Sequence, residues 1–115
     1  MFNANDLEGF TGTENYYFNP LFRSIKYTDG CKFLSDNGAA WLVTDILSHL
    51  SSNRKVNREA FISAKFEKKV KGWLLTFDDG NGNIMDCQKY EYSDFPMPSI
   101  KFFITDNVMM LPSEY

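Results

Sequence analysis

The chain has few of the residues that metal and disulfide chemistry needs. It holds two cysteines, Cys31 and Cys87, and one histidine, His49, in 115 residues. A closed zinc site takes four Cys or His ligands, so this set cannot build one within a single chain. Secreted domains held by disulfides normally carry more cysteines, and these two form no C-x-x-C pair. The composition therefore predicts a reducing, cytoplasmic location, no metal site and no cofactor.

Long apolar runs and targeting patterns are also missing. No run approaches the roughly 20 apolar residues that a membrane span requires. Residues 1–10 have neither a basic start nor an apolar core, so no signal peptide is predicted. Seven Gly and four Pro are too few for a low-complexity chain. We therefore expect one globular domain over residues 1–115 that does not associate with membranes.

Aromatic residues, by contrast, are abundant, at 17% of the chain. Each buries about 150–250 Å² when it enters a core, so a fraction of them would fill a domain of this size. The remainder is predicted to lie at the surface, where Tyr and Trp favour binding interfaces. Because the N-terminal third has no periodic face to bury its aromatic side chains, we expect a partner surface there and at Tyr115.

Apolar spacing predicts two helices in the first half of the chain. Thr28 is a suitable N-cap for a helix over about 29–36, and Gly38 is suited to end it. Residues 39–51 then carry one apolar stripe at helical spacing. Its members are Leu42, Val43, Ile46, Leu47 and Leu50.

After residue 53 the apolar period changes to two, as in strands. Ile62, Ala64 and Phe66 alternate with polar residues, although a helix over 58–68 capped by Asn57 is an alternative. Further strands are predicted over 71–77, 84–92, 100–105 and 108–111, the first two of these being joined by a turn at 78–83. We therefore expect an α+β domain, with helices at about 29–36 and 39–51 packed on one face of an antiparallel sheet of about four to five strands.

Charge is unevenly distributed along the chain. Residues 54–71 hold seven basic residues against two glutamates, although the net charge of the whole chain is −3. Basic and aromatic residues interleave in this segment, as they do in proteins that bind single-stranded nucleic acid. A solvated strand face explains the pattern equally well. Nucleic-acid binding is therefore an alternative function, with candidate residues Arg54, Lys55, Arg58, Lys68, Lys69 and Lys71.

Catalytic patterns are weak. His49 follows Asp45 by one helical turn, and Cys31 would be available as a nucleophile, which keeps a small enzyme as a further alternative. An Asp–His pair at this spacing is ordinary on a helix surface. The acidic turn at 79–83 has oxygen ligands at alternate positions, but Ile84 and Tyr90 stand where a calcium loop needs Gly and Glu. No catalytic residue is assigned.

Four short patches have the character of motifs. They are residues 10–17 (FTGTENYY), residues 27–30 (YTDG) together with 39–42 (AAWL), residues 92–96 (YSDFP) and residues 111–115 (LPSEY). In order and spacing they resemble an uncharacterised family, a domain of unknown function, of small bacterial, plasmid- and phage-borne proteins. The third patch departs from the family pattern in having Ser93 in place of Thr. The resemblance covers nearly the whole chain and implies a free-standing cytosolic protein, but it supplies no activity, cofactor or catalytic residue.

The motif residues suggest a binding patch. A carboxylate or hydroxyl recurs beside an aromatic and a turn residue, so we expect an exposed site formed by Glu14, Tyr16, Tyr17, Asp29, Asp94 and Tyr115. The alternative is structural, with these groups capping helices and fixing the N-terminal third to the sheet. The expected function is a non-enzymatic protein-interaction module, such as an inhibitor or modulator of a host nuclease or defence complex. Its protein partner is unidentified, and its oligomeric state, a dimer included, is left open.

Overall fold

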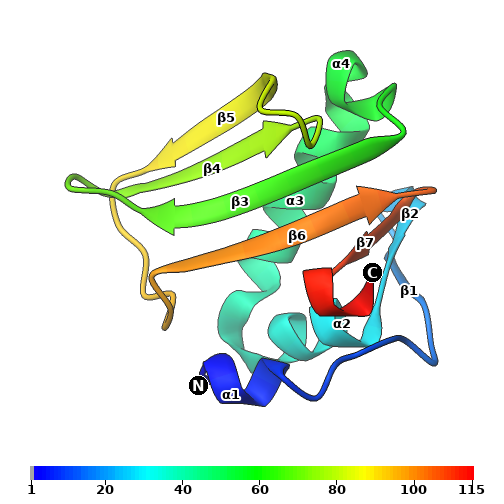
Figure 1. The fold of residues 1–115 in the computed structure, drawn as a ribbon, viewed down its shortest axis with the longest axis horizontal. Coiled ribbons are helices and arrows are strands. Elements are labelled where there is room, and N and C mark those ends of the chain that lie inside the picture. Colours follow the sequence, from blue (N-terminus) through cyan, green and yellow to red (C-terminus); the bar gives the residue numbers. More distant parts are fainter. Residues whose placement is uncertain (1) are drawn as a thin grey trace.

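Seven strands form one mixed sheet in the computed structural model, which describes residues 2–115 (Figure 1). In space the strands follow the order β1-β2-β7-β6-β3-β4-β5. Neighbouring strands are antiparallel except β2 and β7, which are parallel. The strands are β1 (Tyr17–Asn19), β2 (Phe22–Tyr27), β3 (Phe61–Lys68), β4 (Trp73–Asp78), β5 (Ile84–Tyr90), β6 (Ser99–Thr105) and β7 (Val108–Met110).

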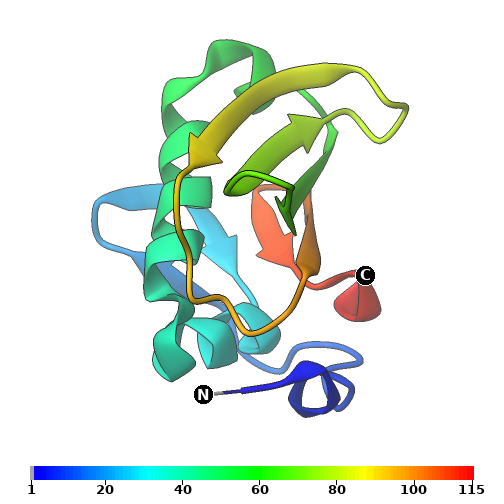
Figure 2. The same cartoon turned by 90° about the vertical axis from the view of Figure 1, so that its left-hand side faces the viewer.

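The two faces of the sheet are named by their position relative to the helices: the inner face is the one that the helices cover, and the outer face is the opposite one. The longest helix, α3 (Ala40–Ser52), covers the inner face, and it lies behind the strands in Figure 1. The C-terminal turn η2 (Pro112–Glu114) lies on the opposite, outer face (Figure 2). The remaining elements are α1 (Ala4–Leu7), α2 (Asp29–Leu34), η1 (Ser35–Ala39) and α4 (Arg54–Asn57). Within residues 2–115, every helix is too short or too polar to cross a bilayer.

The core forms between α3 and the inner face, where the periodicity predicts it. All five residues of the apolar stripe on α3 are buried. In β4 the burial alternates along the strand, with Trp73, Leu75 and Phe77 pointing inward. Phe66 of β3 is fully buried and stacks on Trp73, with 4.8 Å between the ring centres. Most of the aromatic side chains of the chain therefore lie in this core or pack against it.

The predicted sheet of four to five antiparallel strands is wrong, although the α+β class holds. The structure adds β1 and β2, and the parallel pairing of Lys26 with Val108 makes the sheet mixed. Residues 17–27 show no alternation of apolar and polar side chains, because Tyr17 and Phe18 are adjacent aromatics and a turn follows them. The strand is fixed instead by pairing with β7, about 80 residues later, which local periodicity does not encode.

The alternative helix over 58–68 is also wrong. Those residues form β3 from Phe61 onward, which pairs with β4 on one side and β6 on the other. The side chain of Asn57, its proposed cap, lies outside the described part of the chain. Between α2 and α3, Gly38 has a φ of 102°, a left-handed conformation that suits glycine and breaks the helix as predicted.

Candidate functional site

The first polar cluster fixes the N-terminal loop to the start of α2. The carboxylate of Asp29 accepts the N–H of Glu14 at 2.9 Å and the hydroxyl of Tyr17 at 3.2 Å. In return, the N–H of Asp29 donates to the hydroxyl of Thr13 at 2.9 Å. The hydrogen bond from Glu14 is the main cause that lowers the pKa of Asp29. Three of the predicted site residues thus meet here, but Glu14 does so through its backbone.

A second cluster joins the C-terminus to the same helix end. The carboxylate of Glu114 accepts the hydroxyl of Thr28 at 2.6 Å, the N–H of Gly30 at 3.1 Å and the N–H of Leu111 at 3.0 Å. Thr28 occupies the N-cap position as predicted, yet its side chain makes no capping bond to the helix. The first N–H groups of α2 are instead satisfied by Thr13 and Glu114, which come from distant parts of the chain.

Gly30 makes this arrangement sterically feasible. A Cβ atom at this position would lie 2.5 Å from Oε1 of Glu114 and 2.6 Å from Cδ1 of Leu111. Only a residue without a side chain lets the carboxylate approach the helix so closely. Thr28 and Gly30 of the YTDG motif and Glu114 of the LPSEY motif thus make contacts that support the structural alternative for these three residues.

The other predicted site residues lie apart from this cluster. Among residues 2–115, no hydrogen bond or ring contact links Tyr16, Asp94 or Tyr115 to Asp29. Tyr115 packs on Phe61 and Phe103 at the outer face of the sheet. Glu114, which the prediction did not include, is the residue of the LPSEY motif whose side chain makes the long-range hydrogen bonds. No local pattern in the sequence signals that role.

The DFP motif anchors the loop between β5 and β6. Phe95 is 7% exposed and packs edge-on against Phe2 and Phe66. Its N–H donates to the hydroxyl of Ser93 at 3.1 Å. The serine that replaces threonine in the expected pattern therefore keeps the hydroxyl where a bond uses it. Asp94 between them is exposed.

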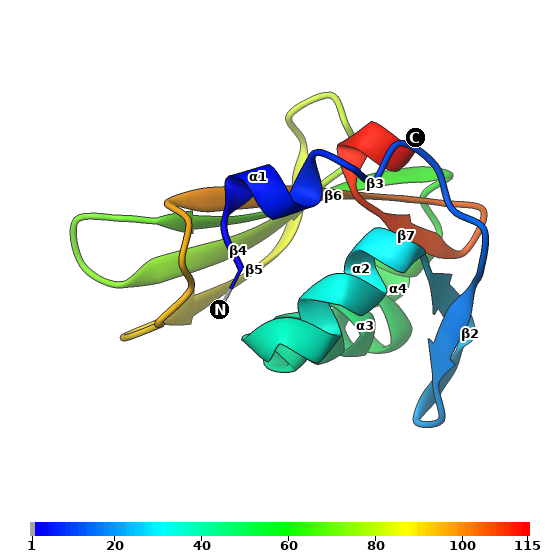
Figure 3. The same ribbon diagram turned by 90° about the horizontal axis from the view of Figure 1, so that it is seen from below.

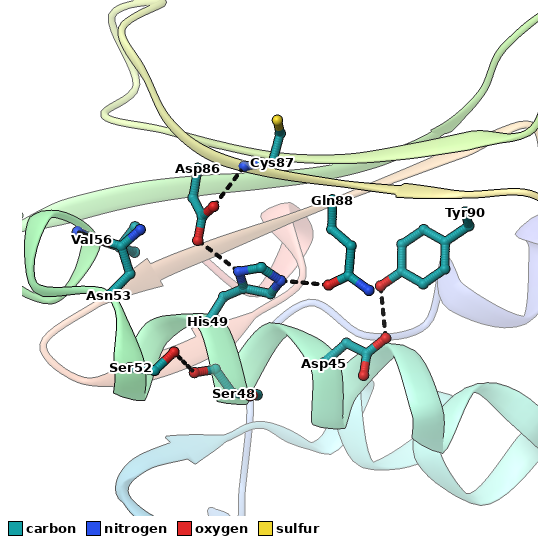
Figure 4. Close-up of polar contacts among 10 residues, drawn as sticks. All are labelled: Asp45, Ser48, His49, Ser52, Asn53, Val56, Asp86, Cys87, Gln88 and Tyr90. Atoms are coloured by element: carbon teal, nitrogen blue, oxygen red, sulfur yellow. Dashed lines mark hydrogen bonds and ion pairs between the residues drawn. The ribbon is translucent and has the colours of Figure 1, made fainter.

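A third polar cluster lies between α3 and the edge strand β5 (Figure 4). The ring of His49 lies between two partners: Nδ1 is 2.6 Å from Oδ2 of Asp86, and Nε2 is 2.5 Å from Oε1 of Gln88. One turn earlier on α3, Asp45 accepts the hydroxyl of Tyr90 at 2.7 Å. In place of the expected local pair, Asp45 and His49 make three hydrogen-bond contacts from the helix to the strand.

The electrostatics of this cluster favour an imidazolium. Burial lowers the pKa of His49, but hydrogen bonds to Gln88 and Asp86 and the carboxylate charges outweigh it and raise the pKa. Burial likewise raises the pKa of Asp86, and its bonds to His49 and Asn53 outweigh that and lower it. A protonated ring donates to both acceptors at once, whereas a neutral ring donates to only one. With both nitrogens engaged, His49 holds the edge strand on the helix.

Cys31, the other residue considered for catalysis, is fully buried in α2. Burial is the main cause that raises the pKa of its thiol to about 12. Its sulfur lies 3.6 Å from the carbonyl oxygen of Met109. A thiol that stays protonated and has no solvent access is a poor nucleophile. Within residues 2–115, no group of three His, Cys, Asp or Glu side chains is placed to hold a metal ion.

Three residues of the His49 cluster were missed from the sequence. Asp86, Gln88 and Tyr90 alternate along β5 and share its inner face, where the neighbouring strand β4 places Phe77, Leu75 and Trp73. The available signal in the sequence was that these three alternating positions, which would face a helix, all carry polar side chains. Their partners on α3, Asp45 and His49, are also four residues apart.

The basic segment does not form one patch. Lys68 is the last residue of β3, and Lys69 and Lys71 lie in the turn between β3 and β4. Arg54 is in α4 and Arg58 directly follows it, at the opposite end of β3. The side chain of Lys55 lies outside the described part of the chain. A strand of eight residues, about 26 Å long, separates the two groups.

The β1–β2 hairpin carries the most exposed apolar surface of the N-terminal third. Its tip projects beyond the helices and the rest of the sheet (Figure 3), whereas β2 packs on α3. Tyr16 is 58% exposed, Phe18 49% and Leu21, at the tip, 80%. The guanidinium of Arg23 lies over the Phe18 ring, 5.4 Å from its centre. We call these four residues the hairpin surface, and they are the candidate functional site.

Comparison with known proteins identifies a family but no characterised relative. The family described as "Family of unknown function (DUF6876)" matches residues 1–115. No curated protein and no solved structure matches the chain. The motifs predict an uncharacterised family, and this match confirms that prediction over the whole chain.

Proposed function

The chain belongs to the DUF6876 family, whose function is unknown, and for this member we propose a role as a protein-interaction module that binds its partner through the hairpin surface. The observation that carries the proposal is the exposure of three large apolar side chains, Tyr16, Phe18 and Leu21, on one projecting hairpin. Clustered exposed apolar side chains are typical of interaction sites. Tyr and Arg, both present here, are enriched among the residues that dominate binding energy.

The charge of the hairpin supports a partner of particular chemistry. Residues 16–27 contain Arg23 and Lys26 but no Asp or Glu, although the chain as a whole has a net charge of −3. Lys26 is the cross-strand partner of Phe18, so a cation and an aromatic ring lie side by side. A complementary partner surface would combine an apolar patch with carboxylates.

The two edges of the sheet differ in a way that also favours the hairpin. At the β5 edge, the carboxylate of Asp86 accepts the N–H of Cys87 at 2.8 Å and so occupies a backbone donor. Lys89 adds a charge on that strand. At the other edge, which is formed by β1, residues 15–21 contain no charged side chain. Charged side chains on an edge discourage strand pairing, so β1 is the edge better suited to receive a strand from a partner.

Within this proposal, the chain acts by occluding or modulating its partner. Binding itself would produce this effect. An inhibitor of a nuclease or defence complex is one specific form, and it rests on the mobile-element character of the resembled family. The experiment below does not depend on that specific form.

The proposal is tested by quantitative capture from a lysate of the cells in which the chain occurs. Wild type is compared with the double variant Phe18→Ser, Leu21→Ser. The matched control is Tyr92→Ser, which removes a ring that is 81% exposed elsewhere on the molecule. We expect a cell protein that is retained by wild type and by the control at equal levels and is reduced at least about tenfold by the double variant, as loss of about 1.4 kcal/mol or more implies.

Equal retention by wild type and the hairpin variant would contradict the proposal. Circular dichroism and urea unfolding show whether the double variant keeps its fold. Because Phe18 and Leu21 are exposed, their replacement should leave the unfolding free energy within about 0.5 kcal/mol of wild type. A loss of binding with unchanged stability then reports on the interface.

A further inference from the structure

A second surface lies on the outer face of the sheet, away from the hairpin. We propose that the outer face of β6, β3, β4 and β5 binds single-stranded nucleic acid, with its backbone on a lysine patch and a base on a neighbouring aromatic platform. The lysine patch is defined as Lys65, Lys69, Lys89 and Lys101. The aromatic platform is defined as Phe61, Phe103 and Tyr115. This site is independent of the hairpin surface.

The register places the lysines together although they are distant in sequence. Lys65 on β3 is directly opposite Lys101 on β6. Both point outward, because Phe66 and Phe102 beside them in sequence are fully buried on the inner face. Like charges directly opposite each other destabilise a sheet. A bound anion would relieve this repulsion.

The next rows extend the positive surface. Lys89 of β5 is the cross-strand partner of Leu74, which in turn is opposite Glu67. Glu67 contacts two lysines, with distances of 3.8 Å to Nζ of Lys65 and 3.1 Å to Nζ of Lys69. Among the described residues, no carboxylate contacts Lys89 or Lys101.

The patch therefore carries excess positive charge in an acidic protein. Its four lysines lie beside Glu67, and Lys71 of the adjacent turn adds to the positive charge. Two further acids border the patch: Asp78 accepts the N–H of Gly80 at 2.7 Å, and Glu91 lines a surface pocket together with Lys71 and Lys89. The partner that matches this charge is a polyanion.

The aromatic platform lies next to the patch on the same face. Tyr115 meets Phe61 and Phe103 edge-on, with ring centres 5.7 and 5.5 Å apart. Tyr115 itself is 72% exposed, so its ring is available to a ligand. Phe103 and Lys101 are two residues apart on β6, which places them about 7 Å from each other along the strand.

Rings beside cations favour nucleic acid over an acidic peptide, and single strands over duplex. Unpaired bases stack on aromatic side chains while the phosphates follow basic residues. An exposed sheet face with aromatic residues is also one way in which proteins bind single-stranded RNA. A base pair within a duplex cannot offer its face to Tyr115, and a run of carboxylates has no ring to stack.

The test uses fluorescence anisotropy with a labelled thymidine oligonucleotide of about twelve residues, within the range that one small domain covers. We expect binding at about 50 mM salt that weakens steeply by about 200 mM. The double variant Lys89→Glu, Lys101→Glu should weaken binding at least about tenfold. The matched control Arg54→Glu, Arg58→Glu makes the same change in net charge at the far end of β3 and should weaken it less than about threefold.

Tyr115→Ala separates nucleic acid from other polyanions. Loss of one stacked base should reduce affinity for the oligonucleotide about tenfold or more while leaving the binding of a poly-glutamate peptide unchanged. No binding at about 50 mM salt would overturn the proposal. Equal losses in both double variants would overturn it as well, because they would show an effect of net charge alone. Equally tight binding of poly-glutamate, insensitive to Tyr115→Ala, would assign the face to acidic peptides instead.

Discussion

The hydroxyl of Thr28 and the carboxylate of Glu114 lie 2.6 Å apart, although 86 residues separate them in the chain. This bond closes the C-terminal turn onto the start of α2, and the same carboxylate accepts two backbone N–H groups. The beginning of one helix and the end of the chain are therefore stabilised together. Thr28, Gly30 and Glu114 hold the C-terminal turn against the start of α2.

Glu114→Ala is expected to destabilise the protein. The change leaves the hydroxyl of Thr28 and the N–H of Gly30 without their acceptor in a partly buried place. Hydrogen bonds to charged groups contribute about 1.5–3 kcal/mol each, so the loss in unfolding free energy should be at least about 1.5 kcal/mol. Urea unfolding measures it. Ser113→Ala, next to it and exposed, is the control and should change stability by less than about 0.5 kcal/mol.

Gly30→Ala tests the same contact from the other side. The added methyl group would lie 2.5 Å from Oε1 of Glu114 and must displace the carboxylate. We expect a loss of about 1–3 kcal/mol in wild type and a smaller loss in the Glu114→Ala background, where only the clash with Cδ1 of Leu111 at 2.6 Å remains. Gly12→Ala, where no atom lies within 4 Å of the new Cβ, should be close to neutral. Additive effects of the two changes would show that the carboxylate is not what Gly30 accommodates.

The contact of His49 with Asp86 predicts a pH dependence with a definite sign. The raised pKa of His49 means that its contribution to stability is complete below about pH 6.5 and is lost as the pH rises through the raised value. The lowered pKa of Asp86 means that its contribution is complete above about pH 3.9 and is lost as the pH falls through the lowered value. Unfolding free energies should therefore fall on both sides of this window.

His49→Gln provides the comparison for the alkaline side. In this variant, the unfolding free energy should fall less steeply as the pH rises above about 6.5. Because His49 is the one histidine of the chain, NMR of its ring protons gives its pKa without ambiguity. The titration should lie above the ordinary value and move down in Asp86→Asn. A pKa of the His49 ring below the ordinary value would contradict a protonated ring held between Asp86 and Gln88.

The two cysteines are expected to react very differently with a thiol reagent. Cys87 is exposed on the edge strand, whereas Cys31 is fully buried and its thiol has a pKa near 12. In native protein we expect one rapid reaction, which Cys87→Ser abolishes. The second thiol should react only when denaturant unfolds the chain. Rapid modification of Cys31 in the native state would show that α2 opens readily.

Local periodicity was enough to find elements whose own apolar pattern marks the face that packs on the core. The alternation of Ile62, Ala64 and Phe66 located β3, and the apolar stripe located α3. The hairpin of β1 and β2 was missed because it depends on the pairing of Lys26 with Val108. Such pairing is determined by tertiary structure, which no window of the sequence contains.

The polar clusters were hard to predict for the same reason. His49 meets residues 37 and 39 positions later, and Glu114 meets Gly30 across 84 positions. The motif residues were recognised as a group, but whether they serve folding or binding depends on which of their atoms are already bonded. The exposure of Tyr16 and Phe18 likewise depends on the position of β1 at the edge of the sheet.

The most direct test of the hairpin as the binding surface is site-specific photocrosslinking in cells. A photoreactive phenylalanine derivative replaces Leu21 in one variant and Tyr92 in another, since both positions are about 80% exposed. Binding through the hairpin predicts a crosslink from position 21 to a cell protein and none from position 92. That crosslink should disappear when Phe18→Ser is added. A crosslink to the same protein from position 92 but not from position 21, or no crosslink from position 21 in a folded protein, would contradict the proposed function.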